Sequence, residues 1–326
     1  MAAIKSAPQR MDSVVIFVVI ALTTLRIAAA DATITIRGSD TMVILAQKWA
    51  ERYMNTHPQV EIRVTGGGSG TGLAALQNQT TDLATVSRRI RASESVSCIK
   101  VFHQRPHEFQ VCLDGLSVYV HEDNTVAELS LADLQQIFTG KATNWSIFGG
   151  PNAPITVYGR ESSSGTYEFF KKNVLKGLDF SVSAQSMPGT ASVVQAVSKD
   201  RYGIGYGGAA YGRNARSIRI RRSENDPAFA PTETHVRTRN YPLWRYLYIY
   251  ADPSQSEGPT KDFLNWILSQ EGQAIVSKVG YYPLAPSIPE RTEAAEHPIA
   301  LPTVEGSSKL NRTEKTDMAA GRRPSI

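Results

Sequence analysis

Three short turns rich in serine, threonine and glycine carry the side chains of this chain that could do chemistry. They are Gly38-Ser39-Asp40-Thr41, the glycine-rich run 66–72 and the run 160–166, which begins with arginine. Each leads into a predicted helix, and a helix start has unpaired N–H groups and a partial positive charge that bind anions. Hydroxyl groups add rotatable donors, and glycine lets the backbone approach a ligand closely. Together the three turns predict a site that surrounds one oxyanion.

The first turn offers Ser39 and Thr41 as hydroxyl donors and Asp40 as an acceptor. Asp40 would repel a fully ionised anion but could accept the proton of hydrogen phosphate. Sulfate has no such proton, so the same carboxylate would oppose its binding. The alternative is a plain helix cap in which Asp40 points away. Asp40 is therefore a candidate for selectivity between anions.

The second turn predicts an anion cradle centred on Ser69 and including Gly70. Two alternatives stand beside it. One is a plain tight turn, and the other is a dinucleotide site, because residues 70–75 fit the pattern G-x-G-x-x-A between a strand and a helix. The N-terminus, described below, predicts an exported protein. Such a protein has no access to the cytoplasmic pool of nicotinamide cofactors, so we favour the anion cradle.

The third turn is the most specific of the set. Arg160 offers a planar fork of donors that matches an oxyanion, and it precedes a helix start by four residues. The candidate ligands at that helix start are Ser164, Gly165 and Thr166. The alternative is an ordinary capped helix with Arg160 paired to Glu161 or Asp179.

A fourth contact is predicted at Ser87 and Arg88, which follow the third predicted strand. Arg88 could equally be a surface charge. No G-x-S-x-G motif occurs at the serines of the three turns, no histidine lies in a motif that marks a base, and no phosphate loop of the form G-x4-G-K-[ST] is present. We therefore expect no catalytic residue, no cofactor and no metal.

The N-terminus predicts export. Lys5 and Arg10 precede an apolar run over 14–22, and three alanines at 28–30 fit a cleavage site. The run is shorter than the roughly 20 residues that span a bilayer, which leaves an uncleaved anchor as the lesser alternative. We expect residues 1–30 to be a signal peptide and the mature protein to be periplasmic or otherwise extracytoplasmic. The net charge of +5 is mild and spread evenly, so no nucleic-acid partner is expected.

Cys98 and Cys112 are the only cysteines. In an oxidising compartment a disulfide between them is the favoured prediction. The alternatives are a zinc site that adds His103 and His107, or two separate thiols. The zinc spacing differs from the usual ligand patterns.

Alternating strands and helices must position the three turns. Strands are predicted at 33–37, 60–65, 81–86, 110–121, 155–158, 202–206 and 243–251, and helices at 41–55, 73–79, 131–139, 166–175, 192–198 and 260–279. This order predicts mostly parallel sheets covered by helices, whose ligands lie at the carboxyl ends of the strands. The two long apolar strands are candidates for crossings between two lobes. Residues 287–326 turn polar and rich in proline, which predicts a disordered tail.

Taken in order, these segments resemble the phosphate-binding proteins of phosphate-specific ABC importers, in the type 2 periplasmic binding protein superfamily. The resemblance runs from about residue 33 to residue 286, and its segments are 38–41, 66–72, 82–88, 137–145, 159–166, 202–206 and 241–245. It implies a two-lobed α/β clamshell with two hinge crossings, in which residues 31–115 and 247–286 form one lobe and 116–246 the other. Some relatives have an aspartate after the third strand that accepts the phosphate proton. Here Ser87-Arg88 stands there, which implies Arg88 as a ligand and Asp40 as the acceptor.

The resemblance implies a receptor that captures inorganic phosphate between its lobes and delivers it to the membrane permease of an ABC importer. We expect a monomer without enzymatic activity. Two alternatives remain open from the residues themselves: an exported phosphomonoester hydrolase, and a receptor for another tetrahedral oxyanion.

Overall fold

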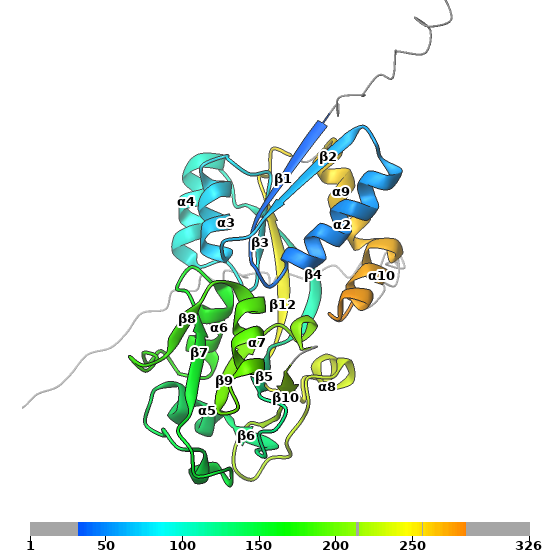
Figure 1. The fold of residues 1–326 in the computed structure, drawn as a ribbon. Coiled ribbons are helices and arrows are strands. Elements are labelled where there is room, and N and C mark those ends of the chain that lie inside the picture. Colours follow the sequence, from blue (N-terminus) through cyan, green and yellow to red (C-terminus); the bar gives the residue numbers. More distant parts are fainter. Residues whose placement is uncertain (1–31, 213–214, 256, 285–326) are drawn as a thin grey trace, which may run out of the picture. The chain divides into compact units, whose positions relative to one another are not determined.

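The computed structural model describes residues 32–212, 215–255 and 257–284. The predictions of a signal peptide over residues 1–30 and of a disordered tail over residues 287–326 lie outside this part of the chain. Two five-stranded sheets organise the described residues, and a third sheet has two strands (Figure 1). Within the described ranges, no helix is both long and apolar enough to cross a membrane.

The first sheet has the strand order β2-β1-β3-β12-β4. Its strands are β1 (Ala32–Gly38), β2 (Val60–Thr65), β3 (Leu83–Val86), β4 (His107–Gly115) and β12 (Trp244–Ala251). The first three are parallel, as the alternation of strands and helices predicts, whereas β12 runs antiparallel to both β3 and β4. The sheet is therefore mixed, because a strand from late in the chain is inserted into it.

Helices cover both faces of this sheet, and we call the sheet with its helices the first lobe (Figure 1). One face packs against α2 (Val43–Thr56), α9 (Pro259–Leu268) and α10 (Gln270–Val279), and the other against α3 (Ser69–Gln77) and α4 (Ala92–Phe102). The helix predicted over 260–279 is wrong as a single element, since it breaks at Ser269. The hydroxyl of Ser269 accepts a hydrogen bond from the Gly272 N–H and starts α10 as a new helix. Helix α4 was not predicted.

The second sheet has the order β10-β5-β9-β7-β8. Its strands are β5 (Ser117–Val120), β7 (Thr156–Arg160), β8 (Gln185–Met187), β9 (Gly203–Gly207) and β10 (Arg216–Ser217). Helices α5 (Leu131–Phe138) and α6 (Gly165–Asn173) pack in one apolar cluster and α7 (Gly189–Lys199) in another. We call this sheet with these helices the second lobe. The remaining elements are β6 (Glu128–Ser130), β11 (Arg219–Arg221), α8 (Glu233–Arg237) and the 3-10 turns η1 (Trp145–Phe148) and η2 (Ala209–Tyr211).

The single strand predicted over 110–121 is wrong, because β4 and β5 belong to different sheets. The chain leaves the first sheet at Gly115, where a Cβ would lie 2.8 Å from Val236 and 2.9 Å from Pro231. At Leu116 the backbone N–H donates to the carbonyl of Leu243, 2.9 Å away. The passage out of the first sheet therefore lies beside the segment that returns to it through β12.

The predicted disulfide is also wrong, because Cys98 and Cys112 are free and buried in different apolar clusters. Cys112, on β4, packs on the α2, α9 and α10 face of the first sheet, whereas Cys98, on α4, packs on the opposite face. The sheet separates the two thiols, which also removes the zinc alternative. Burial raises the pKa of both thiols, so both favour the neutral, unreactive form.

Candidate anion-binding site

All three turns, and Ser87 with Arg88, lie at the carboxyl ends of parallel strands. The turn 38–41 follows β1, the turn 66–72 follows β2 and starts α3, and Ser87 follows β3. The turn 160–166 follows β7 in the second lobe and starts α6. The glycine turn begins its helix at Ser69 rather than at the predicted residue 73, so its hydroxyl lies in the first turn of α3.

Four buried hydroxyl groups from these turns meet at one place. The Oγ1 atoms of Thr41 and Thr166 are 2.8 Å apart, and Ser87 Oγ lies 3.3 Å from both Thr166 Oγ1 and Ser69 Oγ. Each of the four residues is at most 1% exposed. We call Thr41, Ser69, Ser87 and Thr166 the hydroxyl cluster. Because Thr166 belongs to the second lobe and the others to the first, the cluster joins the two lobes.

Backbone N–H groups fix how two of the serine hydroxyls can bond. The Ser87 N–H donates to Ser69 Oγ at 3.0 Å. The N–H groups of Thr166 and Tyr167 both donate to Ser164 Oγ, at 3.2 and 3.3 Å, so Ser164 is the N-cap of α6. A hydroxyl whose lone pairs receive N–H groups keeps its own hydrogen for another acceptor. Accepting these N–H groups and donating to an anion are therefore compatible roles for Ser69 and Ser164.

Glycines bring the turns of the two lobes into contact. A Cβ on Gly165 would lie 2.4 Å from Ser69 Oγ and 2.8 Å from Ser87 Oγ. Gly68 has a φ of +94° and would place a Cβ 2.7 Å from the carbonyl oxygen of Ser163. The Gly70 N–H donates to that same carbonyl at 2.9 Å. The glycine turn of the first lobe thus packs directly on the turn 160–166 of the second.

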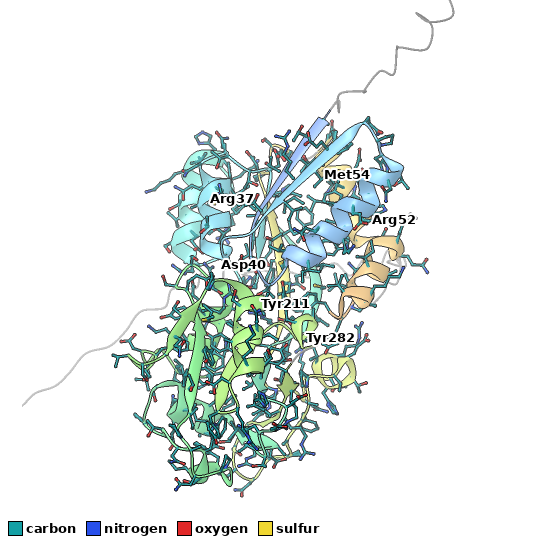
Figure 2. The ribbon with its side chains drawn as sticks, in the orientation of Figure 1. Arg37, Asp40, Arg52, Met54, Tyr211 and Tyr282 are labelled. Atoms are coloured by element: carbon teal, nitrogen blue, oxygen red, sulfur yellow. The ribbon has the colours of Figure 1, made fainter. Side chains whose placement is uncertain are left out.

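Arg160 and Asp40 form a second bridge between the lobes. Arg160 Nη2 donates to Asp40 Oδ2 at 3.0 Å, and the side chain of Arg160 is 1% exposed. The other oxygen of Asp40 accepts from the Gly67 N–H at 2.9 Å, and Tyr211 donates to the Asp40 carbonyl at 2.7 Å (Figure 2). The carboxylate of Asp40 thus holds the second turn and Arg160 together. Its predicted role as the acceptor of a ligand proton stays a prediction.

The remaining donors of Arg160 are engaged within the second lobe. Nε and Nη2 bond the carboxylate of Glu161 at 3.2 and 2.7 Å, and Nη1 donates to Thr190 Oγ1 at 2.9 Å. Burial acts to raise the pKa of the Glu161 carboxyl, but the Arg160 guanidinium outweighs it and holds that pKa below its ordinary value. The pairing with Glu161 is one of the two predicted alternatives, whereas Asp179 pairs with Lys171 instead.

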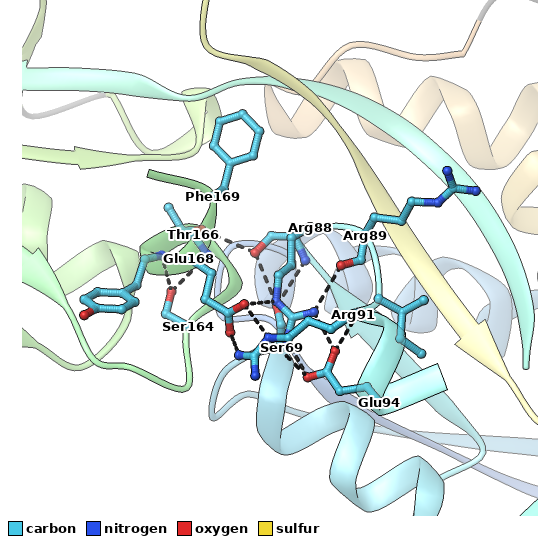
Figure 3. A network of polar contacts seen from close by, with 12 residues as sticks. Ser69, Arg88, Arg89, Arg91, Glu94, Ser164, Thr166, Glu168 and Phe169 are labelled. Carbon is cyan, nitrogen blue, oxygen red and sulfur yellow. Dashed lines mark hydrogen bonds and ion pairs between the residues drawn. The ribbon is translucent and has the colours of Figure 1, made fainter. Parts of the chain in front are cut away.

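Arg88 lies outside the hydroxyl cluster, although Ser87 is part of it. Its Nη1 and Nη2 atoms donate to the carboxylate of Glu94 at 2.8 and 2.7 Å (Figure 3). Its Nε lies 2.9 Å from Glu168 Oε2, close enough for an ion pair, although the N–H is not aligned for a hydrogen bond. Arg91 also contacts Glu168. Arg88 is 7% exposed, so the alternative of a surface charge is wrong.

Two other predicted residues lie at the edge of this arrangement. Ser39 is 2% exposed, and its N–H donates to the carbonyl of Thr85 at 2.8 Å. Gly70 contacts the second lobe through its N–H, as described above.

Sequence reasoning missed Arg245 and Asp114 as parts of the site. Arg245 is 4% exposed, and its Nη2 donates to Thr166 Oγ1 at 3.2 Å, while Asp114 is fully buried beside it. Arg245 falls within a segment that carries the family resemblance, and it interrupts an otherwise apolar strand. A charged residue inside such a strand is the signal that could have identified it, because buried charges need partners.

Known proteins resemble this chain over most of its length. Residues 26–271 match a PBP superfamily domain. The phosphate-binding protein PstS of Pseudomonas aeruginosa is 32% identical over 270 residues, which cover 78% of this chain and 84% of that protein. PstS of Bacillus subtilis is 30% identical over 258 residues, covering 78% of this chain and 82% of that protein.

Among the solved structures that match, two have 26% sequence identity and are covered over the whole of their own chains. A phosphate-bound structure from Clostridium perfringens, described as a phosphate ABC transporter substrate-binding protein, superposes on 78% of this chain with a TM-score of 0.71. An ABC-type phosphate transport receptor from Vibrio cholerae superposes on 77% of this chain with a TM-score of 0.63.

Proposed function

Because the chain belongs to the PBP superfamily, we propose that it is a receptor that captures inorganic phosphate and delivers it to the permease of an ABC importer. The resemblance predicted from the motifs is confirmed by relatives that carry the name phosphate-binding protein. The predicted two-lobed α/β architecture is confirmed by the two solved structures that share it.

The hydroxyl cluster is the observation that carries the proposal. Three of its members come from the first lobe and one from the second, and all are buried where helix starts meet. An anion bound there would receive hydrogen bonds from both lobes and would favour the state in which the lobes are together. We propose as its ligands Ser39, Asp40, Thr41, Ser69, Gly70, Ser87, Arg160, Ser164, Gly165 and Thr166.

Hydrogen-bond donors, rather than net charge, would hold the anion. Arg160 already faces the two carboxylates of Asp40 and Glu161, so its positive charge is compensated. Each hydrogen bond to a charged group contributes about 1.5–3 kcal/mol net. Several such bonds from hydroxyl and backbone donors would offset the cost of removing the anion from water.

Titration calorimetry with inorganic phosphate tests the proposal directly. We expect a single site per chain, and Arg160→Ala and Ser164→Ala should each weaken phosphate binding at least about tenfold. Unchanged affinity in both variants would remove the second lobe from the site. Competition by sulfate and molybdate tests the receptor for another oxyanion, and Asp40→Asn should relax any preference for a protonated ligand. A chromogenic phosphate ester tests the hydrolase alternative, since only an enzyme would release the coloured product.

We further propose that the protein works outside the cytoplasm as a monomer and has no enzymatic activity. The named relatives are binding proteins, which supports the last point. We propose lobe boundaries of 31–115 with 247–286, and 116–246, which the strand membership of the two sheets supports to within a few residues. Fractionation of expressing cells, with N-terminal sequencing of the mature protein, tests export and cleavage after residue 30.

A further inference from the structure

We propose that Arg245, rather than Arg88, is the second arginine that binds the anion beside Arg160, and that Asp114 holds it in position. The inference rests on the proposed function, because it adds a contact to the same site. It requires of the ligand only that it is a tetrahedral oxyanion.

Arg245 reaches the hydroxyl cluster from β12, a strand of the first sheet. Two of the hydrogen bonds of its guanidinium lead to residues of the cluster, one in each lobe. Nη1 donates to the carbonyl of Ser87 at 2.9 Å in the first lobe, and Nη2 donates to Thr166 Oγ1 at 3.2 Å in the second. Thr166 Oγ1 is also the atom to which Thr41 and Ser87 hydroxyls are bonded. Arg245 therefore bonds one of the four hydroxyls directly and is linked through it to two more.

Asp114 fixes the guanidinium of Arg245 in this orientation. The two residues lie opposite each other in the register of β4 and β12. Asp114 Oδ2 accepts from Arg245 Nε at 2.9 Å and lies 2.8 Å from Nη2, and Asp114 Oδ1 accepts from the Ala209 N–H at 3.0 Å. Phe169 lies beside the guanidinium, with its ring centre 5.2 Å away. These contacts together hold the guanidinium in one direction.

The bond from Arg245 to Thr166 is the one that an anion could replace. It is the longest of the bonds described for this guanidinium, and its acceptor is a neutral hydroxyl. An N–H bonds an ionised oxygen about twice as strongly as a neutral one. Exchange of Thr166 Oγ1 for an anionic oxygen would therefore strengthen the bond while Asp114 continues to hold the rest of the fork. The hydroxyl of Thr166 would then be available to donate to the same anion.

Arg88 offers no comparable exchange. Its guanidinium bonds both oxygens of Glu94 and the carbonyl of Arg89, and it is ion-paired with Glu168. Turning it toward the hydroxyl cluster would replace ionised acceptors with another ionised acceptor. It would also leave the half-buried carboxylates of Glu94 and Glu168 with Arg91 as their one remaining cation, which costs free energy.

Matched lysine substitutions test this assignment. Arg245→Lys and Arg88→Lys both keep a positive charge and both remove the planar fork. By calorimetry at constant pH, we expect Arg245→Lys to weaken phosphate binding at least about tenfold. Arg88→Lys should change it by less than about threefold. Equal losses, or a greater loss in Arg88→Lys, would overturn the proposal.

Side-chain NMR supplies a readout that a purely structural role would not move. In protein labelled with ¹⁵N-arginine, the Nε–H resonance of Arg245, assigned through its own backbone, should shift as phosphate is added, and that of Arg88 should not. This measurement uses the wild-type chain, so it decides the matter even if Arg245→Lys fails to fold. A neutral pair, Asp114→Asn with Arg245→Gln, provides a second variant that leaves no unpaired buried charge.

The outcomes separate the two proposals. If the wild-type chain does not bind phosphate, the proposed function fails. If it binds phosphate while the Arg245 resonance stays unshifted and folded Arg245→Lys binds normally, only the assignment of Arg245 fails.

Discussion

Two clusters of polar side chains join the lobes of this protein, and they differ in whether their hydrogen bonds could be replaced by hydrogen bonds to a ligand. The hydroxyl cluster is made of neutral groups that can each donate or accept. The other cluster, Arg88, Arg91, Glu94 and Glu168, consists of two cations and two anions that satisfy one another, and we call it the ionic cluster (Figure 3). Both connect the first lobe to α6, and the neighbouring residues Ser87 and Arg88 belong to one cluster each.

The difference indicates which contacts bind a ligand and which only hold the lobes together. Hydroxyl groups that bond one another can reorient toward an anion and gain charge-assisted bonds. Paired charges gain nothing from such an exchange, because each already has an ionised partner. Adjacent residues can thus serve different purposes, with Ser87 in the exchangeable cluster and Arg88 in the fixed one.

The largest effect is expected from Gly165→Ala, which would break the hydroxyl cluster sterically. The new Cβ would lie 2.4 Å from Ser69 Oγ and 2.8 Å from Ser87 Oγ, and so would force both hydroxyls or the start of α6 to move. Overpacking of this kind costs about 1–3 kcal/mol, so phosphate affinity should fall about 5- to 150-fold by calorimetry.

A matched control is available in the same lobe. Gly159 lies on β7, and a Cβ there would meet its nearest neighbour at 3.9 Å, which is an ordinary contact. Gly159→Ala should therefore leave phosphate affinity within about twofold of wild type. If the two alanine variants bind phosphate equally well, the turns do not enclose the ligand.

Thr166→Val should give the next largest effect, because it removes the hydroxyl at the centre of the cluster while keeping the shape of the side chain. The variant loses the contacts to Thr41, Ser87 and Arg245 together. We expect phosphate binding to weaken about tenfold. Thr238→Val serves as the control, since that hydroxyl bonds only the backbone of its own exposed helical turn. A binding constant unaffected by Thr166→Val would show that the cluster is structural.

Much of this arrangement could be predicted from the sequence, because local patterns decide it. The turn 38–41, the glycine run and the turn 160–166 are each recognisable from residue types, and the alternation of strands and helices places them at strand ends. The hydroxyls of Thr41, Ser69 and Thr166 do meet in the structure. What could not be predicted depends on contacts between distant residues. The break of the strand at Gly115 reflects packing against Pro231 and Val236, and the two cysteines are separated by a sheet that neither local segment reveals.

The roles of the arginines could not be predicted from the sequence either, because they also depend on contacts between distant residues. Arg88 and Arg245 are both buried, and only their partners distinguish them: Glu94 and Glu168 for one, Asp114 and Thr166 for the other. Those partners lie 6 to 131 positions away in the sequence. Residue type and spacing could place arginines near the site but could not say which guanidinium faces the hydroxyls.

Glu168→Gln should have a smaller effect, and this effect should be on the stability of the fold rather than on phosphate binding. It removes the charge that Arg88 and Arg91 contact from the second lobe. We expect the free energy of unfolding by urea to fall by about 1 kcal/mol, with phosphate affinity changed less than about threefold. Asp179→Asn is the control, because the Lys171–Asp179 pair is exposed and lies within one lobe. A tenfold loss of phosphate affinity in Glu168→Gln would mean that the ionic cluster belongs to the binding site.

The smallest expected effect is on the pH dependence of stability, and it distinguishes the ionic cluster from the hydroxyl cluster. Burial acts to raise the pKa of the Glu94 carboxyl, but hydrogen bonds from Arg88 and from the Arg91 backbone outweigh it, so the pKa lies below its ordinary value in the folded chain. A carboxyl whose pKa is lowered by folding stabilises the fold above its unfolded pKa of about 4.3 and loses that contribution as pH falls through the folded pKa. The wild-type chain should therefore lose more unfolding free energy between pH 5 and pH 3 than Glu94→Gln does, by about 1 kcal/mol. Glu224→Gln, at an exposed ion pair, should follow the wild-type curve. Parallel curves for the wild type and Glu94→Gln would indicate that the pairing of Glu94 with Arg88 does not stabilise the fold. The contrast between the two clusters would then be supported by the hydroxyl cluster alone.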